Sequence, residues 1–303
     1  MKSLFDKTEL AGMRLKNRFI RSATYDGFAD KNGHMTKKLY KIYENLAKGG
    51  VGTIITGMTF VSDLENVYPG QSGIYDDTFI DEYQVLTEMA HQYNVNIIMQ
   101  LAYIGSQTSV NVNSGKAVWG PSSVADLAYK NTPKEMTREE IVFVQKSFAD
   151  AAYRAKEAGF DGIQIHAAHG YLLSKFLTPY YNRRTDQYAG NRENRFRMVL
   201  ETFQAIRDRV GSSYPVFIKI NSEDFMKQGM TFSDCKYVCR KLEEMGINAI
   251  EISGGSLSSR PNEGFARKIP PEKNPTTKNM LQKLHRKSKR RSYWLVETGT
   301  LGT

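Results

Sequence analysis

The sequence is poor in cysteine and has no long hydrophobic run, and each shortage excludes a class of protein. Two cysteines in 303 residues cannot form the disulfide framework on which many small secreted domains depend. No run of about 18 apolar residues occurs, so the sequence predicts no membrane-spanning helix. The first residues, MKSLFDKTELAG, lack the apolar core of a secretory signal. We therefore expect a cytoplasmic protein that has no membrane partner.

Acidic side chains are outnumbered by basic ones, but the imbalance is confined to one segment. The formal net charge is +10, from 42 Lys and Arg against 32 Asp and Glu. Ten of the basic side chains and a single acid lie between residues 267 and 291, whereas residues 1–266 carry only +2. A nucleic-acid-binding domain is basic over one face of its fold. We therefore predict no nucleic-acid partner, and a basic-tailed scaffold that touches nucleic acid is the non-enzymatic alternative.

Short apolar runs alternate along the chain with amphipathic segments. Runs rich in Val, Ile and Phe predict buried strands at 19–23, 51–61, 96–104, 162–168, 215–221 and 248–254. Apolar residues at helical spacing predict helices at 36–48, 79–93, 137–158, 193–210 and 233–245. The third helix opens with the pattern of a capping box, from Thr137 to Glu140. The alternation of strand and helix predicts an α/β fold with parallel strands.

The positions of polar residues favour a barrel over an open sheet. No G-x-G-x-x-G follows the first strand and no G-x-x-x-x-G-K-[ST] occurs, so the usual nucleotide loops of open sheets are missing. Polar side chains instead end several predicted strands: Ser22, Thr24, Gln100, His166, His169, Lys219 and Ser253. A site built from many strand ends is typical of a TIM-type (β/α)8 barrel.

The number of strands predicts that this barrel is incomplete. The sixth predicted strand is followed by 48 residues after Gly255, whereas two more βα units need on the order of 60. The run at 292–297 can supply a seventh strand, and no length is left for an eighth. We therefore expect an incomplete TIM (β/α)8-type barrel with about six native βα units.

The segment His166-Ala-Ala-His169-Gly-Tyr171 is the strongest candidate for a catalytic site. His166 ends a predicted strand, and His169 and Tyr171 lie on the turn that follows. Two imidazoles can donate hydrogen bonds to a developing oxyanion while the phenol delivers a proton. The competing interpretations are a solvated polar loop and a zinc site. A catalytic zinc needs three protein ligands and the sequence offers no third one, so we predict no metal.

Three further features allow more than one interpretation. Lys219 lies inside an apolar strand, where it either extends past an outer helix to water or meets an anionic ligand at the mouth of the barrel. Gln100 ends its strand with an amide that either binds an amide-like ligand edge or makes an ordinary strand-end hydrogen bond. Cys235 and Cys239 are four residues apart on a predicted helix, which favours small buried side chains over a metal or redox pair.

The segment from His166 to Arg195 closely resembles the signature of the old yellow enzyme family. The matching stretches are HAAHGYLL (166–173), FLTP (176–179), NRRTD (182–186), YAGN (188–191) and ENR (193–195). Similar stretches elsewhere are Leu4-Phe5, LKNRF (15–19), Gln100-Leu101 and GPS (120–122), so the resemblance runs from residue 3 to residue 276. It implies a TIM-barrel enzyme that binds FMN and uses NAD(P)H to reduce the C=C bond of a small α,β-unsaturated carbonyl compound.

The resemblance implies a set of cofactor-binding residues: Ser22, Ala23, Thr24, Tyr25, Met58, Gln100 and Lys219. The first three would lie against the flavin, and the fourth stands where the family has a Thr or Cys that tunes it. Met58 would flank the isoalloxazine ring, and Gln100 would bond its pyrimidine edge. Lys219 would stabilise the reduced anionic flavin near N1 and O2.

The resemblance also implies the catalytic residues and marks a departure from the family. His166 and His169 would hold the substrate carbonyl oxygen, and Tyr171 would protonate the carbon next to the carbonyl. The third-strand motif of the family usually places His and Arg after Gln-Leu, whereas Tyr103 and Ser106 stand there in this sequence. The substrate pocket is therefore expected to differ from that of the better-known members.

The resemblance ends within residues 274–277, just before the composition becomes basic. We therefore expect an incomplete FMN-binding TIM-barrel domain at 1–277 and a basic, non-native tail at 278–303, as in a truncated or frameshifted reading frame. The family holds the FMN phosphate after strands seven and eight, so we also expect weak FMN binding. The alternatives within the family are an NADH oxidase and a dienoyl-thioester reductase, and outside it a non-catalytic remnant. A homo-oligomer is compatible with the sequence.

Overall fold

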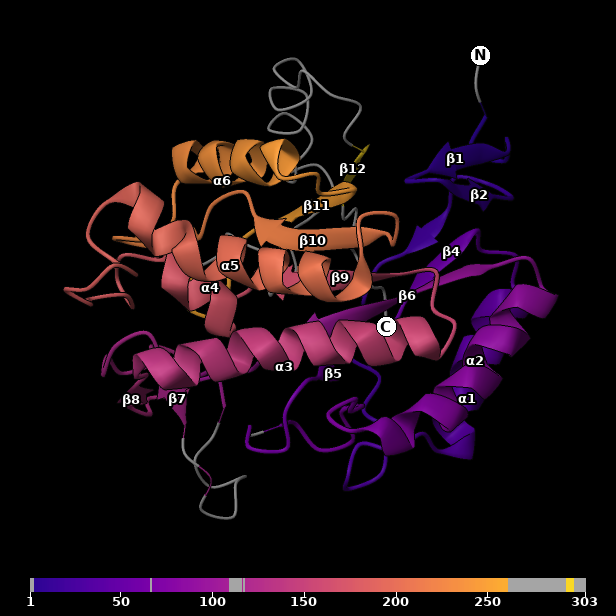
Figure 1. The fold of residues 1–303 in the computed structure, drawn as a ribbon, viewed down its shortest axis with the longest axis horizontal. Coiled ribbons are helices and arrows are strands. Elements are labelled where there is room, and N and C mark those ends of the chain that lie inside the picture. The colour runs from indigo at the N-terminus through magenta and orange to yellow at the C-terminus, as the bar shows by residue number, and fades with distance from the viewer. Residues whose placement is uncertain (1–2, 66, 109–115, 117, 261–292, 297–303) are drawn as a thin grey trace. The chain divides into compact units, whose positions relative to one another are not determined.

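The computed structural model describes residues 3–65, 67–108, 116, 118–260 and 293–296 (Figure 1). Its strands are β1 (Thr8–Leu10), β2 (Met13–Leu15), β3 (Ile20–Arg21), β4 (Thr53–Ile55), β5 (Thr59–Phe60), β6 (Asn96–Ala102), β7 (Trp119–Gly120), β8 (Lys134–Glu135), β9 (Gly162–Ala167), β10 (Val216–Asn221), β11 (Ala249–Ser253) and β12 (Tyr293–Val296). Its α-helices are α1 (Lys37–Lys48), α2 (Ile80–Gln92), α3 (Arg138–Glu157), α4 (Leu172–Leu177), α5 (Arg192–Val210) and α6 (Phe232–Glu244).

The chain forms two compact units, one of residues 1–103, 143–165 and 202–216, the other of residues 104–142, 166–201 and 217–303. In the first unit, β3, β4, β6 and the start of β9 pair in parallel in that order. In the second unit, β10, β11 and β12 pair in parallel in that order. Across the described residues this is the βα order of an incomplete (β/α)8 barrel, as the sequence predicts.

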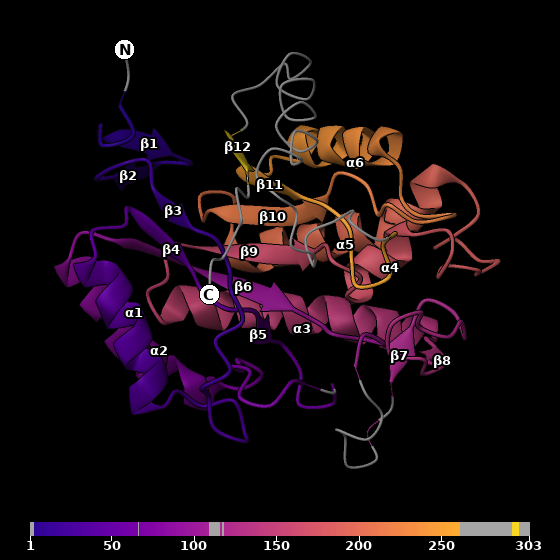
Figure 2. The ribbon, with the colours of Figure 1, turned by 180° about the vertical axis from the view of Figure 1, so that it is seen from behind.

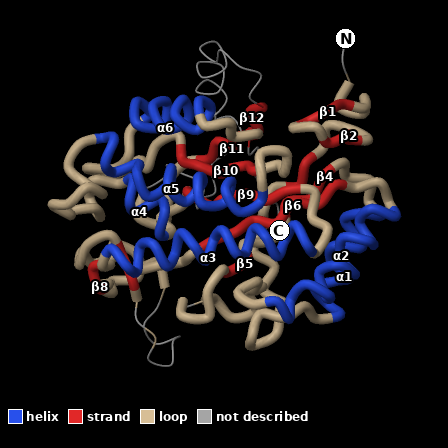
Figure 3. The backbone as a smooth tube through the Cα atoms, in the orientation of Figure 1, coloured by secondary structure: helices blue, strands red, loops and turns tan. Residues whose placement is uncertain are grey.

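The core of the first unit forms around β4 and β6, which are continuous apolar runs. The side chains of Ile54 and Ile97 have no exposed surface. Helices α1 and α2 lie side by side (Figure 3) and bury one apolar face each, including Leu39 and Tyr83. Thr36 begins α1 because its Oγ1 accepts a hydrogen bond from the Leu39 amide at 3.2 Å.

The second predicted strand forms two short strands, β4 and β5, because the chain leaves the sheet at Gly57. A side-chain carbon on Gly57 would lie 2.7 Å from Asp26 Oδ2 and 2.8 Å from the Thr24 carbonyl oxygen, so only glycine fits there. Asp26 accepts from the Arg21 guanidinium at 2.9 Å and from the Tyr43 hydroxyl at 2.5 Å. The Tyr43 hydroxyl accepts from the Gly57 amide at 2.9 Å. Together these hydrogen bonds hold the segment after β3 next to Gly57, where the chain leaves the sheet between β4 and β5.

The core of the second unit forms around β10 and β11, which lie next to each other (Figure 2). All residues of both strands are buried. Helix α6 begins with a capping box. Thr231 Oγ1 accepts from the Asp234 amide at 3.2 Å, and the Asp234 carboxylate accepts from the Thr231 amide at 3.0 Å. The register of β10 and β11 pairs Lys219 with Glu251 across the two strands.

Most of the predicted elements are confirmed to within two residues at each end, including the seventh strand, β12. The sequence did not indicate the β1–β2 hairpin, the β7–β8 pair or α4, which have two to six residues each and show no period of their own. The expected domain boundary at residues 277 and 278 lies outside the described residues. No helix in the described part of the chain has the length and apolar character needed to cross a membrane.

Candidate active site

The second unit brings His166, His169 and Tyr171 together at the carboxyl end of β9. The rings of His166 and Tyr171 lie 4.8 Å apart between centroids, and those of His166 and His169 lie 5.2 Å apart, both nearly perpendicular at 81°. The backbone turns sharply between them because His169 and Gly170 both adopt positive φ, at 63° and 86°. This turn folds the phenol back toward the imidazole that ends the strand.

Burial keeps both imidazoles neutral. The pKa of His166 lies well below the ordinary value, first because the ring is buried and second because the Lys219 ammonium is near. The pKa of His169 is lowered well below its ordinary value by burial, by Lys219 and by His166. His166 Nδ1 accepts a hydrogen bond from the Ala168 amide at 3.2 Å, so the ring proton is on Nε2, which is then a donor.

The ends of β10 and β11 position His169. Its Nε2 lies 2.6 Å from Ser253 Oγ, and its backbone amide donates to Asn221 Oδ1 at 3.2 Å. Asn221 in turn donates to Asp224 Oδ1 at 2.9 Å. Burial raises the pKa of the Asp224 carboxyl, which also accepts from Thr178 Oγ1 at 2.7 Å. His169 is therefore held by side chains from two strands as well as by its own turn.

Lys219 forms a buried ion pair, which neither interpretation of the sequence had anticipated. Its Nζ lies 3.2 Å from Glu251 Oε1, and each side chain is 2% exposed. The lysine therefore does not extend past an outer helix, and its charge is balanced inside the unit. The sequence did carry a signal for this partner, because Glu251 interrupts the apolar run of the next strand at the register position opposite Lys219.

The other proposed flavin-contacting residues lie in the first unit, at the ends of its strands. Ser22, Ala23, Thr24 and Tyr25 follow β3, and Thr24 Oγ1 donates to the Ser22 carbonyl oxygen at 3.3 Å. Tyr25 is half exposed, donates its hydroxyl to the Pro69 carbonyl oxygen and packs edge to face on Tyr68. The structure therefore fixes the orientation of the Tyr25 ring by local contacts.

Met58 and Gln100 complete the set in the first unit. Met58 is buried in the break between β4 and β5. Gln100 is buried in β6, and its Nε2 donates to Gln164 Oε1 at 2.7 Å, from the register-matched position of β9. An ordinary strand-to-strand hydrogen bond is therefore one function of Gln100. The amide oxygen and nitrogen that it carries are also the groups that a pyrimidine edge requires.

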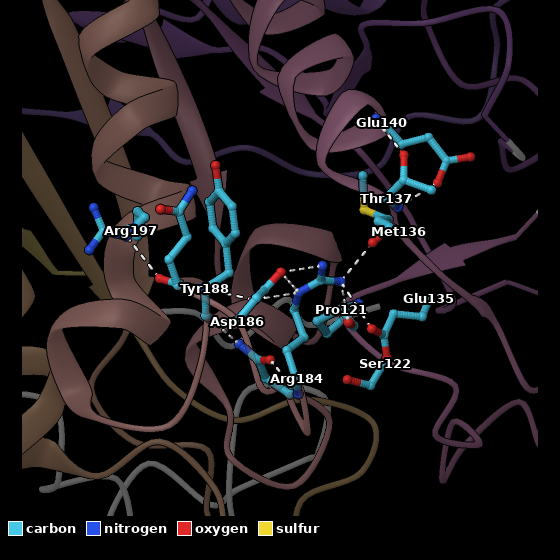
Figure 4. A network of polar contacts seen from close by, with 12 residues as sticks. Pro121, Ser122, Glu135, Met136, Thr137, Glu140, Arg184, Asp186, Tyr188 and Arg197 are labelled. Atoms are coloured by element: carbon cyan, nitrogen blue, oxygen red, sulfur yellow. Dashed lines mark hydrogen bonds and ion pairs between the residues drawn. The ribbon is translucent and has the colours of Figure 1, made fainter.

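The stretch from Asn182 to Tyr188, which carries much of the family signature, braces loops of the second unit (Figure 4). Arg184 donates to the carbonyl oxygens of Pro121 at 2.9 Å and Met136 at 2.7 Å, and it pairs with Asp186 at 2.7 Å. Asn182 Nδ2 donates to two carbonyl oxygens, each at 2.8 Å. The contacts of these polar residues therefore stabilise loops of the second unit, and this accounts for their presence without a catalytic role.

The two cysteines of the sequence both lie in α6. Cys235 and Cys239 are buried with their sulfur atoms 3.8 Å apart, as expected for small core side chains. Among the described residues, no group of three or more His, Cys, Asp or Glu side chains is arranged to hold a metal ion. Each unit taken by itself carries donor chemistry that suits a flavin, because the second offers the buried cation of Lys219 and the first the buried amide of Gln100.

A sequence profile of the NADH:flavin oxidoreductase / NADH oxidase family matches residues 3–302, and the chain belongs to this family of FMN-dependent enzymes. A metal reductase from Desulforamulus reducens is 35% identical over 255 residues, covering 84% of this chain and 38% of the relative. An NADPH dehydrogenase from a Geobacillus species is 34% identical, covering 84% of this chain and 73% of the relative. Old Yellow Enzyme from a Pichia species superposes with a TM-score of 0.76 at 25% identity, covering 82% of this chain and 70% of its own.

These comparisons confirm the old yellow enzyme resemblance and the barrel class. The family match also extends past residue 276, which corrects the expectation that the resemblance ends within residues 274–277. The chain spans less than half the length of the metal reductase.

Proposed function

We propose that this chain uses NAD(P)H to reduce the C=C bond of a small α,β-unsaturated carbonyl compound. The observation that carries the proposal is the cluster of two buried, neutral imidazoles and a phenol at the end of β9 and on the tight turn that follows it. A neutral imidazole donates a hydrogen bond without adding a full charge, which suits a carbonyl oxygen that becomes negative only during the reaction.

His166 and His169 would bind the carbonyl oxygen and stabilise the developing negative charge. The proton of His166 is on Nε2, because Nδ1 accepts the Ala168 amide. Each such donor is worth about 2.7–4 kcal/mol of transition-state stabilisation. Tyr171, next to His166, would then donate its hydroxyl proton to the carbon adjacent to the carbonyl.

FMN, when bound, supplies the hydride that reaches the other carbon, having received it from NAD(P)H. The residues proposed to hold it are Ser22, Ala23, Thr24, Tyr25, Met58, Gln100 and Lys219. Their proposed roles follow the resemblance. The backbone at 22–24 and Met58 would contact the ring, Gln100 would bond the pyrimidine edge, and Lys219 would favour the anionic reduced form.

Replacing Tyr171 by Phe tests the proton donor directly. We expect the reoxidation of pre-reduced enzyme by an enone, followed in a single turnover, to slow by roughly 10²–10⁴-fold. Reduction of the flavin by NAD(P)H should stay unchanged, because the phenol takes no part in that step. Tyr237→Phe, on α6, is the matched control and should leave both rates unchanged. An unaltered enone rate in Tyr171→Phe would exclude the proposed role.

The family description also names NADH oxidases, so oxidation by O₂ is the second candidate function. This reaction transfers no proton to carbon. Oxygen consumption with NADH should therefore be the same in Tyr171→Phe and in the unmodified chain. If the unmodified chain consumes O₂ with NADH and shows no reaction with enones or unsaturated thioesters, the oxidase assignment replaces the proposed one.

A further inference from the structure

A second buried ion pair lies in the same unit as the candidate site, and the proposed chemistry does not use it. The ammonium of Lys175, in α4, donates a hydrogen bond to the carboxylate of Asp126, and each side chain is 1% exposed. The same ammonium donates to Ser106 Oγ at 2.7 Å and lies 4.5 Å from the centre of the Tyr181 ring. Burial lowers the pKa of Lys175, and Asp126 opposes that shift.

The pair joins segments that are far apart in the chain. Asp126 accepts from the backbone amides of Ala128 at 2.9 Å and Tyr129 at 2.7 Å, which fixes its own loop. The Tyr181 hydroxyl accepts from the Leu127 amide at 3.3 Å and contacts Ser258 Oγ at 2.9 Å. Lys175 is therefore the point at which the 126–131 loop, the residues after β6 and helix α4 meet.

Helix α4 follows directly from Tyr171 and has too few residues to be stable by itself. Tyr171 is its N-cap residue, and the Tyr171 carbonyl oxygen accepts from the Lys175 amide at 2.9 Å. All six residues of α4 are buried, and so short a helix takes its position from its packing. The anchor at Lys175 thus lies one turn from the proposed proton donor and is bonded to its backbone.

Residues 105–107 lie against the same segment at three points. Ser106 accepts from Lys175. A side-chain carbon on Gly105 would come within 3.2 Å of Leu172 Cβ. A side-chain carbon on Gly170 would lie 2.3 Å from Gln107 Oε1, so the turn before Tyr171 leaves no space beside Gln107.

We propose that Lys175 is a positioning residue for Tyr171. Its ion pair with Asp126 and its hydrogen bond to Ser106 fix α4 and the turn at 169–171, and thereby the orientation of the Tyr171 phenol. This inference deepens the proposed function and rests on it for the role of Tyr171. A buried ion pair adds little net stability compared with an apolar pair, but its partners must meet in one geometry. Fixing the geometry of a neighbouring catalytic group is a function that an apolar pair would perform less well.

The test compares Lys175→Met, Asp126→Asn and the double variant Lys175→Met/Asp126→Asn in the full chain. Each single variant leaves one buried partner without its counter-charge and should lower Tm, whereas the double variant should recover most of that loss. Positioning is read separately, from the fluorine NMR signal of 3-fluorotyrosine placed at Tyr171. We expect this signal to shift or broaden in the double variant even though Tm has recovered.

The same double variant should slow single-turnover enone reduction by roughly 10–100-fold, as expected for a misplaced donor, with flavin reduction by NAD(P)H unchanged. Ser106→Ala removes one hydrogen bond and no charge, so it should shift the fluorine signal partway and lower Tm less than either single charge variant. Arg192→Met, which breaks the Arg192–Asp234 pair elsewhere in this unit, is the control and should leave the fluorine signal unchanged.

An unshifted fluorine signal in both the double variant and Ser106→Ala would overturn the inference and leave Lys175 a core ion pair only. The fluorine signal does not depend on turnover. If the unmodified chain fails to reduce enones, the proposed function fails, while the signal still decides whether Lys175 positions Tyr171.

Discussion

At the scale of single residues, burial decides the charge of the two candidate histidines. An unfolded histidine has a pKa of about 6.5, and the pKa values of His166 and His169 in the folded chain are lowered well below it. Below pH 6.5 these two histidines therefore bind protons in the unfolded chain but not in the folded chain. Folding stability must fall as the pH drops from about 6.5 toward the lowered values.

We predict an acid-side loss of stability that belongs to these two residues. Each should remove up to about 1.4 kcal/mol of unfolding free energy per pH unit in that window. Urea unfolding between pH 5 and 8 should show a shallower acid limb in His166→Asn/His169→Asn than in the unmodified chain. The control is His91→Asn, because the hydrogen bond that His91 donates to the Asp161 carboxylate raises the pKa of His91. The loss of His91 should have the opposite effect and make the acid limb steeper. An identical slope in the unmodified chain, in His166→Asn/His169→Asn and in His91→Asn would contradict the assignment.

We predict that Lys219 and Glu251 depend on each other. Glu251→Gln leaves a buried ammonium without its counter-charge and should lower the unfolding free energy by about 3–5 kcal/mol, measured by denaturant titration. Lys219→Met/Glu251→Gln should recover most of this loss. Lys219 is one cause of the low pKa of His166, so the double variant should also raise that pKa in an NMR titration. The pKa of His166 should stay below the ordinary value, because the ring remains buried. Additive losses in the double variant would show that the two side chains do not interact.

At the scale of elements, the sequence predicts where helices begin because the hydrogen bonds that cap a helix join residues close together in the chain. The Thr137–Glu140 capping box is present as predicted: the Thr137 amide donates to Glu140 Oε2 at 2.8 Å, and Thr137 Oγ1 accepts from the Glu140 amide at 3.2 Å. Helix α4 was missed because a buried six-residue segment has no solvent-facing side from which a helical period could be recognised. The break at Gly57 was missed because it depends on Asp26 and Tyr43, which are distant in sequence.

We predict that Thr137→Ala destabilises the protein by about 1 kcal/mol, since the first turn of α3 loses its cap. Urea unfolding followed by circular dichroism measures the change. The matched control is Ser147→Ala in the same helix, where the hydroxyl bonds only to the Phe143 carbonyl oxygen one turn back. That change should stay within about 0.5 kcal/mol. Equal effects of the two substitutions would exclude the cap as the cause.

At the scale of the whole molecule, we predict that FMN raises the thermal unfolding temperature. A ligand that binds only the folded chain adds about 2.7 kcal/mol of stability at a concentration of 100 Kd. The increase in Tm should therefore grow with FMN concentration, and differential scanning fluorimetry at a wavelength outside flavin emission measures it. Lys219→Met/Glu251→Gln should reduce the shift if Lys219 contacts the flavin. A Tm independent of FMN up to millimolar concentration would contradict the proposed cofactor role of this chain.

The sequence by itself determined the order of strands and helices, the parallel class of the sheet and the His166–Tyr171 cluster. Apolar periods, helix caps and a cluster that spans six consecutive residues are local, so they can be recognised in the sequence directly. Only the tertiary structure decided that Lys219 meets Glu251 and that Lys175 meets Asp126. The first contact depends on the register of two strands, and the second joins residues 49 positions apart. Glu251 does interrupt the apolar run of its strand, but no contiguous stretch of sequence specifies either contact. Each charge is stable in the core only where the fold supplies its partner.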